Sequence, residues 1–260
     1  MKTTIPRDQV YQTNKPAPGL RHAIRAGVVL MGAAALLMLP LMTTLQAAGN
    51  RSDVNPGVLP PQSHPYGKTY AEWAAEWLKF VYSVPFDHNP QFDFSLNVPL
   101  PGVVGQSGAV SFPISSDAIV PAGQGIFLQV FRVNLGTCPG NPDPFVLPAP
   151  GQTIEERLTE LAQIYNDAVT ELTVEIDGVR LKNPFQYRAS SGVLSNLAFG
   201  PGYEDFITPC GPGPGEHQDI VEGFWLMLAP LPKGQHTIHV AFAQTLWDLS
   251  VEYVLHITVE

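Results

Sequence analysis

LSVEYVLHITV, residues 249–259, is the stretch of the sequence that decides the fold. Every second side chain from Leu249 to Val259 is apolar, and the side chains between them are mostly polar. Because successive side chains of a strand point to opposite faces of its sheet, this pattern predicts a strand with one face on a core and the other in solvent. Such a strand is typical of the outer sheet of a β-sandwich.

Upstream of this stretch, further apolar or alternating runs predict more strands. Asp177-Gly178 separates two of these runs and predicts a tight hairpin turn. Phe224–Ala229 is apolar on both faces, as expected of a central, buried strand. The expected strands are residues 109–114, 126–133, 172–176, 179–181, 224–229, 236–243 and 249–259.

Two helices are marked by the same signal, a threonine followed three residues later by a glutamate, which forms a capping box. Thr69 and Glu72 begin the first helix, which Pro85 ends, and Thr153 and Glu156 begin the second. The first helix carries an aromatic and apolar stripe of Trp73, Trp77, Phe80 and Val81. Many strands and only two helices favour a mainly β fold, namely an antiparallel, immunoglobulin-like β-sandwich with two packed helices.

The N-terminal segment is expected to direct export. Arg21 and Arg25 precede an apolar run from Ala26 to Leu45, and Gln46-Ala47-Ala48 follows with small residues suited to cleavage. This order is typical of a signal peptide, which predicts a periplasmic or extracellular protein. An uncleaved membrane anchor is the alternative, because the run is nearly long enough to span a bilayer. The expected organisation is a signal peptide at 1–48, a disordered linker at 49–65 and a β-sandwich domain at 66–260.

Charge divides the chain unevenly. Five basic residues and one acidic residue lie in positions 1–48, so nine basic and 22 acidic residues remain, a net charge of −13 for the rest. An acidic body repels nucleic acid and anionic lipid, so we expect no nucleic-acid partner and membrane contact only through an uncleaved N-terminal segment. Cations, cationic substrates and neutral polymers stay compatible with this charge.

The opening and closing segments of the domain share a likeness with known sequences. Tyr66–Trp73 has the form YGxTYxEW, Gly105–Gly108 precedes an early strand, and Glu222–Leu231 with Gly234–Ile238 has the form WLMLxPLxxGxHTI. Together they resemble a group of uncharacterised exported bacterial proteins. The resemblance covers most of the domain and implies an exported sandwich. It implies no activity and no functional residue.

The chain has two cysteines, Cys138 and Cys210, each in a loop rich in proline and glycine. In an oxidising compartment two such cysteines are expected to form a disulfide. Two free thiols are the alternative, and two cysteines alone are a weak metal site.

Three sets of residues are candidates for chemistry or binding. Asp87-His88 and Glu216-His217 each place a carboxylate beside an imidazole, a pairing that can bind a divalent metal or supply a general base. If the two loops met, they would form one site, but the sequence does not show that they meet. Trp73 and Trp77 are expected to pack on a sheet, and the alternative is an exposed stacking platform for sugars.

The sequence supports three functions and establishes none. Motifs of serine hydrolases, zinc proteases and P-loop NTPases are missing, and no cofactor is indicated. The leading hypothesis is therefore a non-catalytic exported protein that binds a glycan or an envelope protein. The alternatives are an exported hydrolase or metal-assisted enzyme, and a structural or interaction protein with long, exposed, apolar strand edges.

Overall fold

A computed structural model describes residues 57–89, 104–114, 117–138, 144–195, 197–203 and 217–260. The expected signal peptide lies outside these residues, as does the first half of the expected linker. No helix among the described residues has the length and apolar character needed to cross a membrane.

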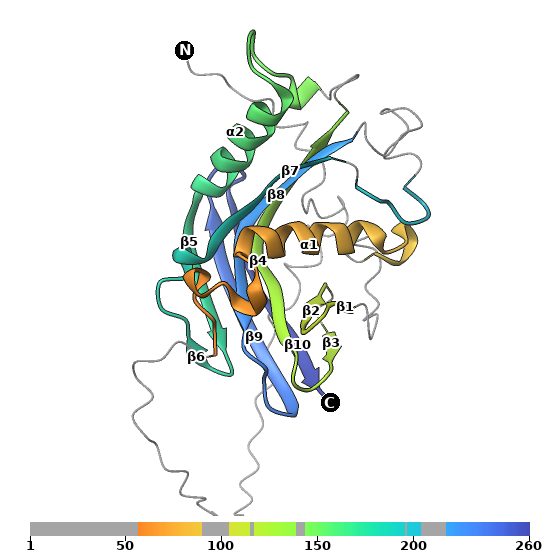
Figure 1. Cartoon of the computed structure of the whole chain (residues 1–260). Helices are drawn as coiled ribbons and strands as arrows, with labels where there is room; N and C mark the ends of the chain where they lie inside the picture. Colours follow the sequence, from red (N-terminus) through yellow and green to blue (C-terminus); the bar gives the residue numbers. More distant parts are fainter. Residues whose placement is uncertain (1–56, 90–103, 115–116, 139–143, 196, 204–216) are drawn as a thin grey trace, which may run out of the picture. The chain divides into compact units, whose positions relative to one another are not determined.

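The described chain is mainly β, with two five-stranded sheets and two α-helices (Figure 1). The first sheet has the order β1-β2-β4-β8-β7, and the second has the order β3-β10-β9-β5-β6. The strands are β1 Val104–Ser107, β2 Val110–Pro113, β3 Asp117–Val120, β4 Gly125–Thr137, β5 Val169–Ile176, β6 Val179–Arg180, β7 Arg188–Ser195, β8 Gln218–Leu228, β9 Gly234–Gln244 and β10 Leu249–Val259.

Two strand pairs are parallel, so the expectation of a purely antiparallel fold was wrong at these positions. β2 pairs with β4 at Val110↔Gly125, and β3 pairs with β10 at His256↔Asp117. The chain crosses from β2 in the first sheet to β3 in the second and then returns to β4. This double crossing lets β4 run in the same direction as β2.

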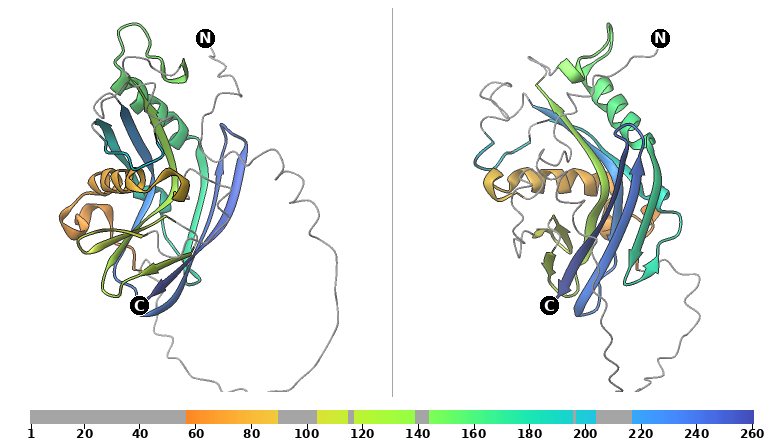
Figure 2. Two further views of the ribbon diagram at one scale, coloured as in Figure 1. Left: turned by 90° about the vertical axis from the view of Figure 1, so that its right-hand side faces the viewer. Right: turned by 180° about the vertical axis from the view of Figure 1, so that it is seen from behind.

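Strand β8 is central, as the sequence predicted, and it is buried on both faces. Trp225 on one face contacts Trp77 of helix α1 (Tyr70–Ser83), with ring centroids 5.2 Å apart. On the opposite side of the first sheet, Phe131 of β4 contacts Phe242 of β9 at 5.0 Å. The first sheet therefore lies between α1 and the second sheet (Figure 2).

Both helices begin where their capping boxes predicted. Thr69 accepts a hydrogen bond from the Glu72 amide and the Glu72 carboxylate accepts one from the Thr69 amide, and the same reciprocal pair forms at Thr153 and Glu156. Helix α2 (Ile154–Asp167) packs Leu158, Leu161 and Tyr165 into the core. Helix α1 buries Trp73, Trp77 and Val81 of its predicted stripe, and Phe80 is partly buried.

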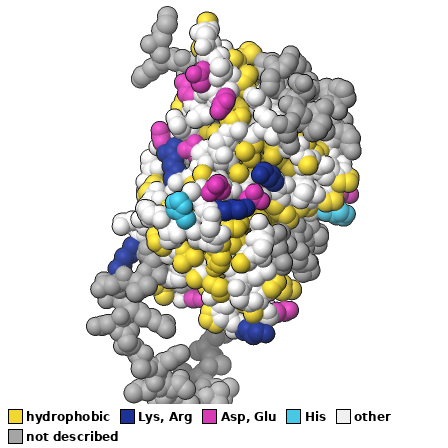
Figure 3. Space-filling view, viewed as in Figure 1, with side chains coloured by type: hydrophobic (Ala, Val, Ile, Leu, Met, Phe, Trp, Pro, Cys, Tyr) yellow, Lys and Arg dark blue, Asp and Glu magenta, His cyan; other side chains and the backbone are white. Residues whose placement is uncertain are grey.

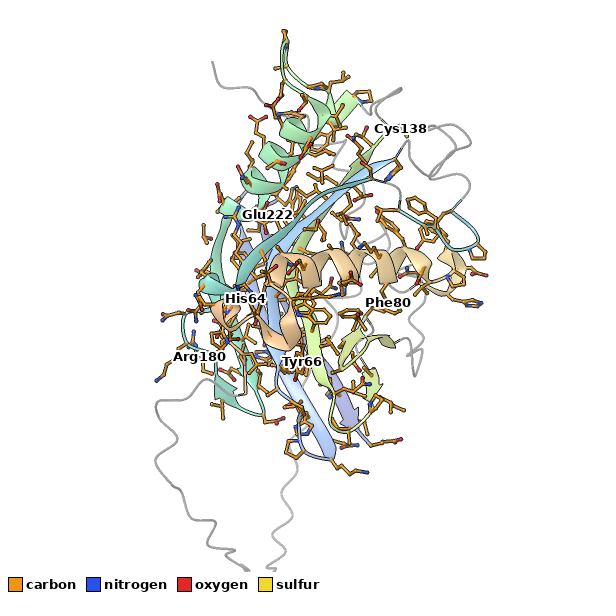
Figure 4. The ribbon with its side chains drawn as sticks, viewed as in Figure 1. His64, Tyr66, Phe80, Cys138, Arg180 and Glu222 are labelled. Carbon is orange, nitrogen blue, oxygen red and sulfur yellow. The ribbon has the colours of Figure 1, made fainter. Side chains whose placement is uncertain are left out.

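The expected linker is shorter than predicted, because the chain is packed from Val58 onward. Val58 is buried and forms a β-bridge with Leu228 of β8. Ahead of α1, His64 and Tyr66 adopt left-handed backbone conformations, and the Trp73 indole donates a hydrogen bond of 2.9 Å to the Pro65 carbonyl. Tyr66 and His64 lie beside the start of α1 (Figure 4). Proline-rich composition indicated a loop here but could not show its packing.

Candidate functional site

The two tryptophans of α1 are core residues. Trp73 is 2% exposed and Trp77 is 1% exposed. Trp73 packs against Phe112 and Phe127, and Trp77 lies under the Arg132 guanidinium at 4.9 Å from the ring centroid. Burial removes the exposed stacking platform for sugars that the sequence had left open.

The proposed acid–imidazole site does not assemble among the described residues. Asp87 and His88 are exposed in a short 3-10 turn after α1, whereas His217 is buried beside Asp219. Glu216 lies outside the described residues. No group of three or more potential metal ligands forms in the part of the chain that the structure describes. The structure thus gives no support to a metal site here.

His217 instead belongs to a buried polar cluster that joins α1 to the first sheet. The Tyr82 hydroxyl from α1 lies 2.6 Å from Oδ2 of Asp219 on β8, and the His217 Nδ1 lies 3.5 Å from the same oxygen. Asp219 is 0% exposed and His217 is 4% exposed. Phe199 covers the imidazole edge-on at 5.3 Å. Solvent is therefore excluded from the three polar groups.

Burial is the largest cause of the pKa shifts of Asp219 and His217. It raises the pKa of the Asp219 carboxyl well above its ordinary value, although the Tyr82 hydrogen bond and the nearby Arg132 charge act in the opposite direction. It lowers the pKa of His217 to about 4. Burial thus disfavours the charged form of each group, because charge is costly to desolvate.

Asn134 of β4 completes the cluster. With its amide nitrogen turned toward the sheet, Asn134 donates to the Ile220 carbonyl at 3.0 Å and to Asp219 Oδ1 at 2.8 Å. Its oxygen then accepts from the Tyr82 hydroxyl at 2.9 Å, and this hydroxyl also lies 2.6 Å from Asp219 Oδ2. Tyr82, Asn134 and Asp219 thus have hydrogen-bond partners within the cluster, so we interpret it as a structural element rather than a reactive one.

Gly136 makes room for this cluster. It lies opposite Asp219 in the β4–β8 register, and a Cβ atom there would collide with Asp219 Oδ2 and approach His217 Cε1 to 2.7 Å. The sequence predicted His217 and Asp219 as loop residues. It did not reveal Tyr82 or Asn134, because these partners are distant in the sequence.

A second buried carboxyl group on β8 is paired with an arginine. Glu222 accepts from the Arg188 guanidinium of β7 at 2.7 Å (Nε) and 2.6 Å (Nη2). Arg188 also pairs with Asp167 at the end of α2. Glu222 lies on β8, between α1 and α2 in Figure 4. This ion pair ties α2 and the β7 edge to the central strand.

Cys138 is buried at the end of β4 (Figure 4). Cys210 lies outside the described residues, so the disulfide between them stays a prediction.

One edge of β10 has no described strand beside it over most of its length. Strand β9 pairs with β10 along its whole length, from Leu249 to Val259. On the other side β3 pairs only from His256 to Val259. On the side away from β9, no described strand lies beside the stretch from Leu249 to Leu255. This stretch contains no bulge, proline or lysine.

The hydrogen bonds of Glu260, after the last residue of β10, show which backbone groups of the strand face the open side. The Glu260 carbonyl accepts from Ala122 at 2.7 Å, and the Glu260 amide donates to Val120 at 3.1 Å, so Glu260 faces the β3 side. Backbone groups alternate in direction along a strand. The amides and carbonyls of Ser250, Glu252 and Val254 therefore face the open side.

The outermost strands of the two sheets have features that hinder strand addition. β1, β3 and β6 have four, four and two residues, respectively. β7 begins with the charged Arg188 and is bent by a register shift between Ser190 and Val193, where Gly192 has φ +67°. Short strands, charges and bulges are the usual means of preventing strand addition. The β10 edge lacks all three, apart from the single charge of Glu252.

Side chains at the open edge divide by face. Leu249, Val251, Tyr253 and Leu255 point inward and are only partly buried. Glu252 points outward, where its carboxylate is 2.7 Å from the His239 imidazole of β9. His236 lies on the opposite face of β9, with its Nδ1 2.7 Å from Asp177 Oδ2.

Comparisons with protein-family models, curated proteins and solved structures found no match to this chain. The proposed function therefore rests on the residues of this chain.

Proposed function

We propose that this chain is an exported, non-catalytic protein of the cell envelope that binds a protein partner by strand addition at β10. The observation that carries the proposal is the open edge from Leu249 to Leu255. Its backbone groups face outward and its inward side chains are half-buried. An added strand would form hydrogen bonds with these backbone groups and cover these side chains.

Location in the periplasm or outside the cell is part of the proposal. It is supported by the basic, apolar and small-residue order of residues 1–48 and by the pair Cys138 and Cys210. The net charge of −13 after residue 48 disfavours nucleic acid as a partner. The immunoglobulin-like subtype of the sandwich also belongs to the proposal, supported by two five-stranded sheets that share one core.

Among the two kinds of partner considered, the structure favours a protein over a glycan. Burial of Trp73 and Trp77 removes the aromatic platform on which the glycan hypothesis depended. On the face that carries α1, hydrophobic and uncharged side chains predominate and charges are scattered (Figure 3). The alternative of a structural protein with an apolar strand edge uses the same β10 surface and is tested by the same experiment.

Site-specific photo-crosslinking in cells that make the full chain tests the proposal. We expect a crosslinker at Ser250 to give one discrete adduct in the envelope fraction, mapped by mass spectrometry to an extended segment of a partner. A crosslinker at Thr237, on the outer face of β9, serves as the control. The proposal fails if Ser250 gives no adduct, or if fractionation finds the intact product in the cytosol.

A further inference from the structure

We infer that the partner strand at β10 is apolar on its inward face and, when paired antiparallel, basic at the position opposite Glu252. This inference deepens the proposed function and rests on it. It adds the chemistry of the ligand, which the proposed function leaves open.

The register of the added strand follows from the ends of the open edge. The open stretch begins after the β9–β10 turn, at Leu249, and ends where β3 begins to pair, at His256. Glu252 is therefore at its centre. An incoming antiparallel strand makes hydrogen-bonded pairs with the three residues whose backbone groups face it, namely Ser250, Glu252 and Val254. Glu252 therefore belongs to the middle one of the three hydrogen-bonded pairs.

The inward face requires apolar side chains from the partner. Val251 and Tyr253 lie between the three hydrogen-bonded positions and are partly buried. The Tyr253 hydroxyl is already used, because it donates to the Val130 carbonyl of β4 at 2.5 Å. Its ring and the Val251 side chain thus offer hydrocarbon surface for the residues opposite them, and directly opposed side chains contact each other in an antiparallel pair.

The outward face selects for a positive charge. The Glu252 side chain is 70% exposed and is the one charged side chain between Leu249 and Leu255. Opposite charges directly across a strand pair stabilise it and like charges destabilise it. Glu252 therefore favours a lysine or arginine on the partner strand.

The same geometry disfavours a second copy of the chain. Two β10 edges paired about their centres would match Ser250 with Val254 and would place Glu252 against Glu252 of the second copy. The two carboxylates would then lie directly opposite each other in a hydrogen-bonded pair, where like charges destabilise the pairing. Glu252 thus acts against self-association while it favours a basic partner.

The expected preference for a basic partner over a second copy can be tested with a variant of the chain itself. The Glu252→Lys variant presents the same strand with a basic residue at the central position, so it serves as the partner for the wild-type chain. We expect each protein alone to be monomeric in analytical ultracentrifugation. An equimolar mixture should form a 1:1 complex at least about tenfold tighter than either self-association.

Two variants identify the surface used. Val254→Pro in both chains removes an amide that faces the edge and should abolish the complex, because proline is tolerated at strand edges but cannot donate. Val254→Thr keeps the amide and should leave the complex intact. Thermal unfolding checks that both variants fold.

Three outcomes would overturn the inference: no complex in the mixture up to millimolar concentration, wild-type self-association as strong as the mixture, or a complex insensitive to Val254→Pro in a folded variant. The proposed function has a separate readout. If Ser250 crosslinks to a partner segment that has no basic residue opposite Glu252, the inference fails and strand addition at β10 stands.

Discussion

Strands β8 and β10 both have eleven residues, yet they meet opposite environments. β8 has β4 and β7 on its two sides, α1 and the second sheet on its two faces, and partners for its buried carboxyls. β10 has β9 on one side and β3 only at its end. Contacts are therefore concentrated at β8, whereas β10 keeps backbone groups that no described strand pairs.

The largest expected effect comes from the ion pair on β8. Arg188→Ala leaves the buried Glu222 carboxylate without its cation and should lower the free energy of unfolding by about 3 kcal/mol, less than for a fully buried pair because Arg188 is partly exposed. Arg180→Ala is the control, since Arg180 is exposed and bonds only Thr173, and it should cost under about 0.5 kcal/mol. Urea unfolding measures both. Equal losses would contradict the account.

Gly136→Ala tests the close packing of β4 on β8. The added methyl group meets Asp219 and His217 in the enclosed cluster, so we expect a loss of about 2 kcal/mol in the free energy of unfolding. A variant as stable as the wild type in urea unfolding would show that the two side chains do not lie over Gly136.

One substitution made in both strands compares them directly. Val221→Thr buries a hydroxyl in β8 and should cost about 1–2 kcal/mol, whereas Val254→Thr on the exposed face of β10 should change stability by less than about 0.5 kcal/mol. Thermal unfolding of the two variants measures the difference. Similar losses would mean that β10 is covered on its outer face.

Asp219→Asn has the smallest effect, and its sign depends on pH. The folded-state pKa of Asp219 is raised, so its stabilisation is complete below about pH 4 and is lost as pH rises through the folded pKa. Asparagine does not ionise, so the variant should match the wild type at pH 4 and exceed it at pH 8 by about 1 kcal/mol. His217, whose folded pKa is lowered to about 4, loses its contribution as pH falls from 6.5 toward 4 in both proteins.

Urea unfolding at pH 4 and pH 8 gives this difference. A variant less stable than the wild type at pH 8 would mean that the Asp219 carboxylate stabilises the folded protein, contrary to the raised pKa of this group.

The features that sequence predicted correctly are local. The capping boxes at Thr69 and Thr153, the hairpin at Asp177-Gly178 and the two-sided pattern of residues 249–259 each depend on neighbouring residues. The parallel pairs depend on a chain crossing between sheets, which no local pattern encodes.

The buried cluster and the open edge could not be predicted for the same reason. Tyr82 and Asp219 are 137 residues apart, so nothing near either residue indicates the contact. The sequence did identify β10 as an outer strand with one apolar face. It could not show that β3 covers only its last four residues.

Residue-resolved amide hydrogen exchange along β10 tests the central claim most directly. An open edge predicts alternation in the isolated protein: fast exchange at Ser250, Glu252 and Val254, whose amides face solvent, and slow exchange at Val251, Tyr253 and Leu255, whose amides face β9. Equal protection of all six amides would contradict the account, because it would mean that a strand already occupies the edge.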